Sequence, residues 1–175
     1  MKRIFFGILI PLLILSLVSS SIANNGRGGI KKMKISSPEF KHKEYIPSKF
    51  TCQGDDINPA LVIDGIPDEA KSLALIVDDP DAPMGMWVHW VVFNIPIGPR
   101  IEEDAIPGKQ GSNDFGRNNY GGPCPPSGTH RYFFKIYALD MTLNLEEGIT
   151  KKELEAAMAG HILDKDELIG LYKKN

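Results

Sequence analysis

Three aspartates and a histidine lie close together in the stretch 78–96, which reads DDPDAPMGMWVHWVVFNIP. Like charges at this spacing cost stability, so a packed fold needs a reason to keep them. His89 follows two residues after Trp87 on an apolar run, and strand alternation would place both on one face. A carboxylate such as Asp79 favours imidazolium, which together with exposed backbone N–H groups can hold a phosphate or a carboxylate. These residue types therefore predict an anion-binding site.

A second histidine begins another apolar run, where His130 and Tyr132 are two residues apart and share one strand face. The loop before them, 120–128, reads YGGPCPPSG. Its glycines allow a ligand to approach the backbone, and its prolines stiffen the loop at low entropic cost. Taken alone, each histidine is better explained as a strand-end residue whose ring bonds to the backbone. Only their convergence with Asp79 would make a binding site.

The elements that must position these residues are mostly strands. Two runs, Ser72–Val77 and Trp87–Ile95, are apolar on both faces, which predicts central strands buried between layers. A third run, His130–Leu139, alternates in the manner of a strand with one core face. Shorter strands are predicted at Lys31–Phe40, Tyr45–Phe50, Ala60–Ile63 and Glu167–Tyr172.

One helix is predicted after the third long strand. Thr150 and Glu153 form a capping box, apolar residues follow at helical spacing, and Gly160 ends the pattern. The segment 96–126 is rich in Gly, Pro and Asn and has no regular pattern, although its aromatic residues suggest that it packs. Strands outnumber helices and no βαβ rhythm is present, so the predicted class is mainly β with one or two outer helices.

The N-terminus is typical of an export signal. Two basic residues precede an apolar run, and Ser21 and Ala23 place small residues at a signal-peptidase site. We expect residues 1–23 to be a signal peptide, 24–30 a flexible leader and 31–175 a single domain. An uncleaved membrane anchor is the alternative, although the apolar run is short for a membrane span. The protein is thus expected in the periplasm or outside the cell.

Composition excludes some partners. Cleavage after Ala23 leaves 152 residues, with 18 basic side chains against 22 acidic ones and a net charge of −4. A nucleic-acid partner would need a basic face, and electrostatic attachment to anionic lipid would need one too. We therefore expect no nucleic-acid binding and no stable membrane association after cleavage.

The sequence contains two cysteines, Cys52 and Cys124. An even count in an exported protein favours a disulfide. Two buried thiols that never meet are the alternative, because the sequence does not give their separation.

Three motifs in order, DPDAP, WxHW and GGPCPPSGTHRY, closely resemble those of the phosphatidylethanolamine-binding proteins, in the bacterial and archaeal branch described as Raf-kinase-inhibitor-like. The resemblance covers the chain from about Cys52 to the C-terminus. It implies a large central antiparallel sheet, a smaller second sheet and peripheral helices. It also implies a small anion pocket. The residues expected to form or shape that pocket are Asp79, Asp81, Pro83, Trp87, His89, Gly122, Pro123, His130 and Tyr132.

The resulting expectation is a binding protein without a cofactor or a catalytic residue. Its ligand would be a phosphate- or carboxylate-bearing group such as a phosphoethanolamine head, and it would modulate a protein such as a protease or a kinase. One alternative is a hydrolase using Ser127, His130 and Asp79, although Ser127 is not in a GxSxG turn. Another is a zinc site built from the histidines and aspartates, which lack a closely spaced ligand pair. The oligomeric state stays open.

Overall fold

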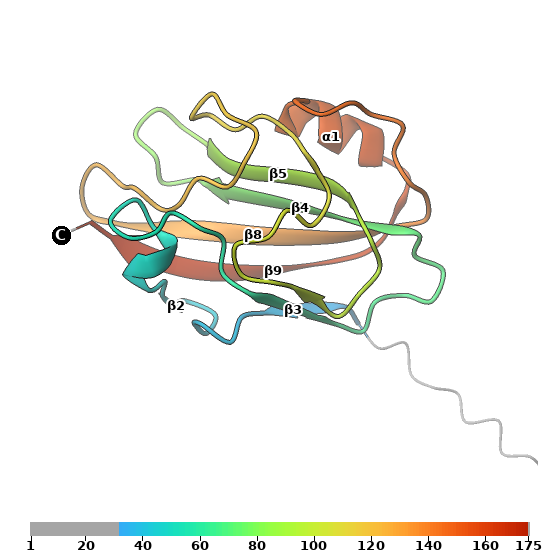
Figure 1. Ribbon diagram of the computed structural model, residues 1–175, viewed down its shortest axis with the longest axis horizontal. Helices are drawn as coiled ribbons and strands as arrows, with labels where there is room; N and C mark the ends of the chain where they lie inside the picture. The colour runs from blue at the N-terminus through green and yellow to red at the C-terminus, as the bar shows by residue number, and fades with distance from the viewer. Residues whose placement is uncertain (1–31, 175) are drawn as a thin grey trace, which may run out of the picture.

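The computed structural model describes residues 32–174, which form two β-sheets and one α-helix (Figure 1). The larger sheet has six strands in the order β2-β9-β8-β4-β5-β7, and its pairs are antiparallel except for the parallel pair of β2 and β9. The smaller sheet has three antiparallel strands in the order β1-β3-β6. This architecture confirms the mainly β fold with a large central sheet and a smaller second one.

The long strands of the larger sheet are β4 (Ser72–Asp79), β5 (Trp87–Ile95), β8 (Thr129–Leu139) and β9 (Ile162–Lys173). The short strands are β1 (Lys34–Ser36), β2 (Glu44–Tyr45), β3 (Leu61–Asp64), β6 (Arg100–Ile101) and β7 (Lys109–Gln110). The helix α1 spans Lys151–Met158, and a single 3-10 turn, η1, spans Ser48–Phe50.

Both faces of the larger sheet are covered, which explains the two-sided apolar runs. On one face, Leu73, Leu75 and Val77 of β4 belong to the core that includes the smaller sheet. On the other face, Ala74 and Ile76 belong to a second cluster with residues of α1. Figure 1 shows α1 and β3 on opposite sides of the long strands. Strands β4 and β5 are therefore the central buried strands that the sequence predicts.

Helix α1 begins at the predicted capping box, in which Thr150 accepts a hydrogen bond from the Glu153 backbone and the Glu153 side chain accepts one from Thr150. The predicted strand at Tyr45–Phe50 is wrong, because β2 ends at Tyr45 and a 3-10 turn follows Pro47. Proline cannot donate to a strand ladder, and its fixed φ suits the turn. The closing strand is longer than predicted, because its exposed first half pairs with β8 throughout.

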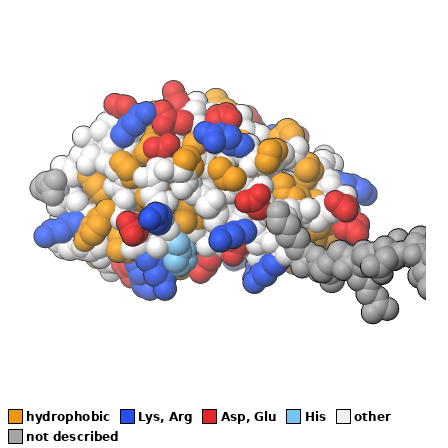
Figure 2. All heavy atoms as spheres, turned by 90° about the horizontal axis from the view of Figure 1, so that it is seen from below, with side chains coloured by type: hydrophobic (Ala, Val, Ile, Leu, Met, Phe, Trp, Pro, Cys, Tyr) orange, Lys and Arg blue, Asp and Glu red, His pale blue; other side chains and the backbone are white. Residues whose placement is uncertain are grey.

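Acidic and basic side chains are interspersed over the face shown in Figure 2, with apolar side chains between them. Within residues 32–174, no helix is long and apolar enough to cross a membrane. The predicted signal peptide, 1–23, the predicted leader, 24–30, and the first residue of the predicted domain, Lys31, lie outside the described residues.

Candidate functional site

One end of strand β4 and the beginnings of β5 and β8 come together at the same end of the larger sheet. Strand β4 pairs antiparallel with both β5 and β8, so its last residue, Asp79, lies at the end of the sheet where β5 and β8 begin. Asp79 pairs with Trp87 in the ladder, and Asp78 pairs with Phe133. The loop between β4 and β5 and the loop before β8 meet at the same end of the sheet, at the left of Figure 1. The topology therefore brings the two histidines and Asp79 together.

Asp79 is a buried carboxylate whose two oxygens both have partners. Its Oδ2 accepts a hydrogen bond of 2.7 Å from Nδ1 of His130, and its Oδ1 accepts one of 2.8 Å from the backbone N–H of Asp81. Only 3% of Asp79 and 7% of His130 are exposed. The carboxylate thus fixes the orientation of the His130 ring and the turn that starts the β4–β5 loop.

His89 occupies a β-bulge. Val77 pairs with Trp90 and Asp78 pairs with Val88, which leaves His89 as an extra residue without a partner on β4. A bulge of this kind turns one side chain out of the regular alternation and is common next to functional sites. Here it lets His89 and Trp90, although consecutive, both turn to the side of the main core. The freed carbonyl of His89 accepts hydrogen bonds from the backbone of Gly121 and the side chain of Asn113.

The ring of His89 is bound to the same glycine. Its Nδ1 lies 2.6 Å from the carbonyl oxygen of Gly121. A carbonyl only accepts, so Nδ1 carries a proton and, in the neutral ring, Nε2 is an acceptor. Burial lowers the pKa of His89, and the opposing effects of the Gly121 carbonyl and the Asp79 charge are smaller. At neutral pH, burial therefore favours the neutral ring of His89, although the nearby carboxylate favours imidazolium.

Tyr132 supplies the least satisfied polar atom of the site. Its side chain is fully buried, and its ring meets that of His89 edge to face at a centroid distance of 5.1 Å. Its hydroxyl has no hydrogen bond of ordinary geometry among the described residues, although the backbone N–H of Cys124 is near enough to lower its pKa slightly. Burial, followed by the Asp79 charge, raises the pKa of this phenol, so the hydroxyl keeps its proton. A buried polar atom without a partner is rare, and it marks a place where a water molecule or a ligand can bind.

These side chains face a pocket of about 310 Å³. Its polar lining comes from Asp79, His89 and Tyr132, and the predicted residues Pro83 and Trp87 also line it. The remaining lining residues were not predicted: Ala82, Met84, Phe115, Cys124, Pro125 and Pro126. The walls of the pocket are thus mostly apolar, and a few polar side chains are set into them.

Phe115 was missed because it belongs to the irregular segment 96–126, and no periodicity tells which of its residues reach the pocket. Its ring packs edge to face against both Trp87 and His89, at 5.5 and 5.3 Å. Met84 is 94% exposed at the mouth. The apolar residues of the β4–β5 loop were the only feature of the sequence that could have indicated a role for Met84.

The other predicted site residues lie around the pocket rather than in its lining. Asp81 binds Arg131 through both carboxylate oxygens, and this contact lowers the pKa of Asp81. Gly122 donates its N–H to Asp56, and a Cβ there would come within 2.7 Å of both Asp56 and Thr51. These residues hold the walls in place.

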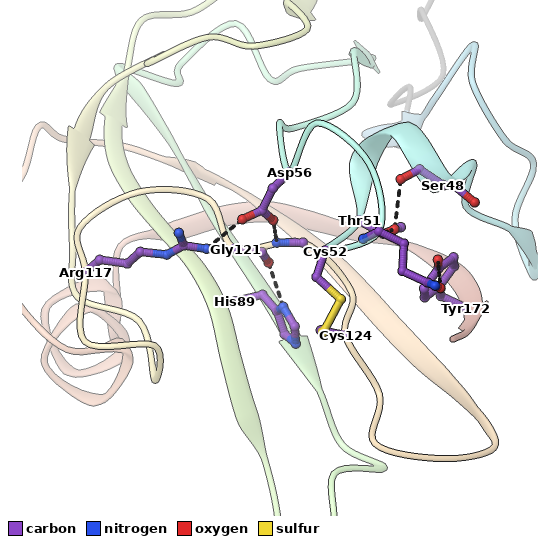
Figure 3. The surroundings of a disulfide bond; sticks show 11 residues. Ser48, Thr51, Cys52, Asp56, His89, Arg117, Gly121, Cys124 and Tyr172 are labelled. Atoms are coloured by element: carbon purple, nitrogen blue, oxygen red, sulfur yellow. Dashed lines mark hydrogen bonds and ion pairs between the residues drawn. A yellow bond between two sulfur atoms is a disulfide. The ribbon is translucent and has the colours of Figure 1, made fainter. Parts of the chain in front are cut away.

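A disulfide joins Cys52 to Cys124, with a Cα–Cα distance of 5.4 Å, as the sequence suggested (Figure 3). The Cys52 N–H also donates to the carbonyl of Pro123, another predicted site residue. Because Cys124 lines the pocket, the bridge ties the pocket wall to the turn that follows η1. Figure 3 places the bridge next to the His89 ring.

The two alternative chemistries find little support in this geometry. Ser127 is exposed, and among the described residues no hydrogen bond joins it to His130. No three His, Cys, Asp or Glu side chains within residues 32–174 come together as metal ligands. The arrangement is instead one of hydrogen-bonding groups around a small pocket.

Comparison with known proteins agrees with this architecture. The sequence model described as phosphatidylethanolamine-binding protein matches residues 36–173. A UPF0098 protein of Pyrococcus horikoshii is 50% identical, over 95% of this chain and 89% of its own length, and one of Methanothermobacter thermautotrophicus is 50% identical over 81% and 99%.

Two solved structures share the fold. A Chlamydia trachomatis protein, described as a homologue of phosphatidylethanolamine-binding protein, has a TM-score of 0.81 and 44% identity, covering 83% of this chain and 99% of its own. Escherichia coli YbcL, described as a new member of the mammalian PEBP family, has a TM-score of 0.76 and 29% identity, covering 82% and 99%. Since the family's sequence model spans almost every described residue and the two-sheet fold recurs in these structures, the chain belongs to the phosphatidylethanolamine-binding protein family.

Proposed function

We propose that this protein is an exported binding protein whose pocket takes a small phosphate- or carboxylate-bearing group, such as a phosphoethanolamine head. The observation that carries the proposal is the buried hydroxyl of Tyr132, which has no hydrogen-bond partner among the described residues and whose ring packs against that of His89. A phenol O–H is a hydrogen-bond donor, and an oxyanion is the strongest acceptor that it can meet. A ligand oxygen at this place would satisfy it.

The pocket walls agree with a small headgroup. Asp79 offers a carboxylate that can accept a ligand ammonium, and the rings of Trp87 and Phe115 can pack on its methylene groups. We expect weak binding, because one small ion makes few contacts and must displace well-bound water.

Calorimetric titration with phosphoethanolamine tests this proposal. Tyr132→Phe and His89→Ala should each abolish measurable binding, whereas His161→Ala should leave it unchanged. His161 is a suitable control because it pairs with Asp140 beyond the far end of β8. Thermal unfolding of each variant shows whether the fold is retained. Equal affinity in Tyr132→Phe and the wild type would place the ligand elsewhere.

Export rests on the N-terminal sequence. The protein from its native compartment should begin at Asn24, because Ser21 and Ala23 precede the cleavage point. Intact-mass measurement decides this, and a chain that retains residues 1–23 would point to a membrane anchor.

We also propose that the protein acts by binding a partner protein, such as a protease or a kinase, and not as an enzyme. Met84 and Phe115 are exposed apolar residues that line the pocket, and Met86 in the same loop as Met84 is exposed too, which suits a contact with a partner. Inhibition of purified proteases and kinases tests the partner. Ester turnover that disappears in Ser127→Ala would instead establish a hydrolase.

A further inference from the structure

We propose that the pocket selects ligand groups that bring their own proton, such as a singly protonated phosphate, over fully deprotonated oxyanions of the same shape. This inference rests on the proposed function, and it names the protonation state of the ligand that the same site binds. It is argued from the hydrogen-bonding direction of each polar atom in the pocket and from the charges around it.

The acceptor comes from His89. Its Nδ1–H is committed to the Gly121 carbonyl at 2.6 Å, and the His89 carbonyl accepts from the N–H of Gly121 in return. The ring is therefore held in one orientation and one tautomer, which leaves Nε2 as an acceptor. Burial favours this neutral form of the ring. A fully deprotonated oxyanion carries only acceptors and cannot bond to it.

The donor comes from Tyr132. Its buried hydroxyl keeps its proton and has no other partner among the described residues. The acceptor and the donor thus belong to His89 and Tyr132, two pocket residues whose rings are in edge-to-face contact. A P–O–H group that donates to Nε2 and a neighbouring P=O that accepts from Tyr132 match this pair. A protonated carboxylic acid presents the same pattern.

The surrounding charges act in the same direction. No lysine or arginine lines the pocket, and the carboxylate of Asp79 does. His130 is committed to Asp79, Arg131 is paired with Asp81, and Arg117 is paired with Asp56. Asp78 lies on the opposite face of the sheet, bound to two lysines. No unpaired cation on these elements is available to neutralise a dianion, so a second negative charge is disfavoured.

Inorganic phosphate and sulfate separate the possibilities, because they have the same shape and nearly the same size. Phosphate holds a second proton up to near neutral pH, whereas sulfate is a dianion throughout the range in which proteins fold. At about pH 6, which is below the ordinary histidine pKa, phosphate should bind at least about tenfold more tightly than sulfate. This factor corresponds to the loss of one hydrogen bond at a buried acceptor. As pH rises above neutrality, phosphate binding should weaken as that proton is lost.

Dimethyl phosphate provides the second comparison, because it is a monoanion without a proton to donate. It should bind as weakly as sulfate if the proton matters, and as tightly as phosphate if only the charge does. His89→Gln should bring phosphate and sulfate closer in affinity, since the glutamine amide can donate to either. His161→Gln, away from the pocket, should keep the wild-type ratio.

Calorimetric titration of the wild-type protein and both variants gives these affinities. A phosphate preference that His89→Gln removes supports the inference. Equal binding of phosphate and sulfate, or tight binding of dimethyl phosphate, overturns it while the proposed anion pocket stands. If none of the three ions binds, and phosphoethanolamine does not bind either, both proposals fail together.

Discussion

Asp78 and Asp79 are consecutive residues of β4, and they serve opposite faces of the same sheet. Asp78 is fully buried and accepts from the ammonium groups of Lys135 and Lys151, at 2.7 and 2.6 Å. Asp79 is nearly as buried, but it accepts from a histidine ring and a backbone N–H and lines a pocket. The two carboxylates are thus buried to nearly the same extent, and they differ in their hydrogen-bond partners.

The difference separates an anchor from a binding site. On the Asp78 side, two ammonium groups bind the buried carboxylate, and the contact with Lys151 ties α1 to the sheet. On the Asp79 side, the carboxylate is bound by a histidine ring and a backbone N–H, without an ammonium group among its described partners. That side therefore keeps polar atoms available for a ligand. Four experiments test this division, from the largest expected effect to the smallest.

Removing the disulfide should have the largest effect, and it acts on the pocket side alone. The bridge spans 72 residues of sequence, so Cys52→Ser combined with Cys124→Ser should lower the free energy of unfolding by about 4 kcal/mol. Urea unfolding of the oxidised wild type and the double variant measures this. Two titratable thiols in protein taken from its native compartment would contradict the bridge.

Asp78→Asn should cost about 3 kcal/mol of stability, because two lysines lose their buried partner. The expected cost is at the lower end for a buried pair, since both lysines also reach water. Urea unfolding measures the loss, and phosphate titration should show unchanged affinity. Asp79→Asn is the matched control, with a smaller loss of stability and loss of binding. Loss of phosphate binding in Asp78→Asn, with binding retained in Asp79→Asn, would contradict the assignment of Asp78 as an anchor and Asp79 as a site residue.

The wild-type protein should lose stability as pH falls below about 6.5, the ordinary histidine pKa. Burial lowers the pKa of His89, so in this range the unfolded chain binds a proton that the folded protein does not. The loss continues until pH reaches the folded pKa of His89. Urea unfolding of the wild type and His89→Gln across this range isolates the contribution. An identical pH profile in both would show that His89 is not the group responsible.

Arg131→Ala should have the smallest effect, a barely detectable loss of stability, because its pair with Asp81 is largely solvent-exposed. Since this pair lowers the pKa of Asp81, its contribution is present above about pH 4 and disappears as pH falls further. Thermal unfolding at neutral and acidic pH measures it. A loss of several kcal/mol would mean that the Asp81 loop carries part of the core.

The long strands and the helix were predictable because their signals are local. The two-sided runs around Leu75 and Val91 and the alternation after His130 each require only neighbouring residues to be read. The capping box at Thr150 is equally local. The 3-10 turn after Pro47 was missed because its apolar residues, Ile46 and Phe50, also fit a strand.

The sequence indicated which residues belong to the candidate site, but not their backbone geometry or their protonation. Motif spacing indicated Asp79, His89, His130 and Tyr132, and topology brings them together. The bulge at His89 depends on pairing between strands, which one strand's sequence does not encode. The neutral ring depends on burial, and the contribution of Phe115 depends on how an irregular segment folds back.

The bulge at His89 also has a consequence for the speed of binding. Its carbonyl and its Nδ1–H both bind Gly121, and neither bond involves Nε2. The ring can therefore gain or lose the Nε2 proton without turning and without releasing the loop that carries the pocket wall. Ligand association should then follow a single exponential whose rate rises linearly with ligand concentration, as for a preformed site. A rate that levels off at high concentration would instead reveal a slow opening step.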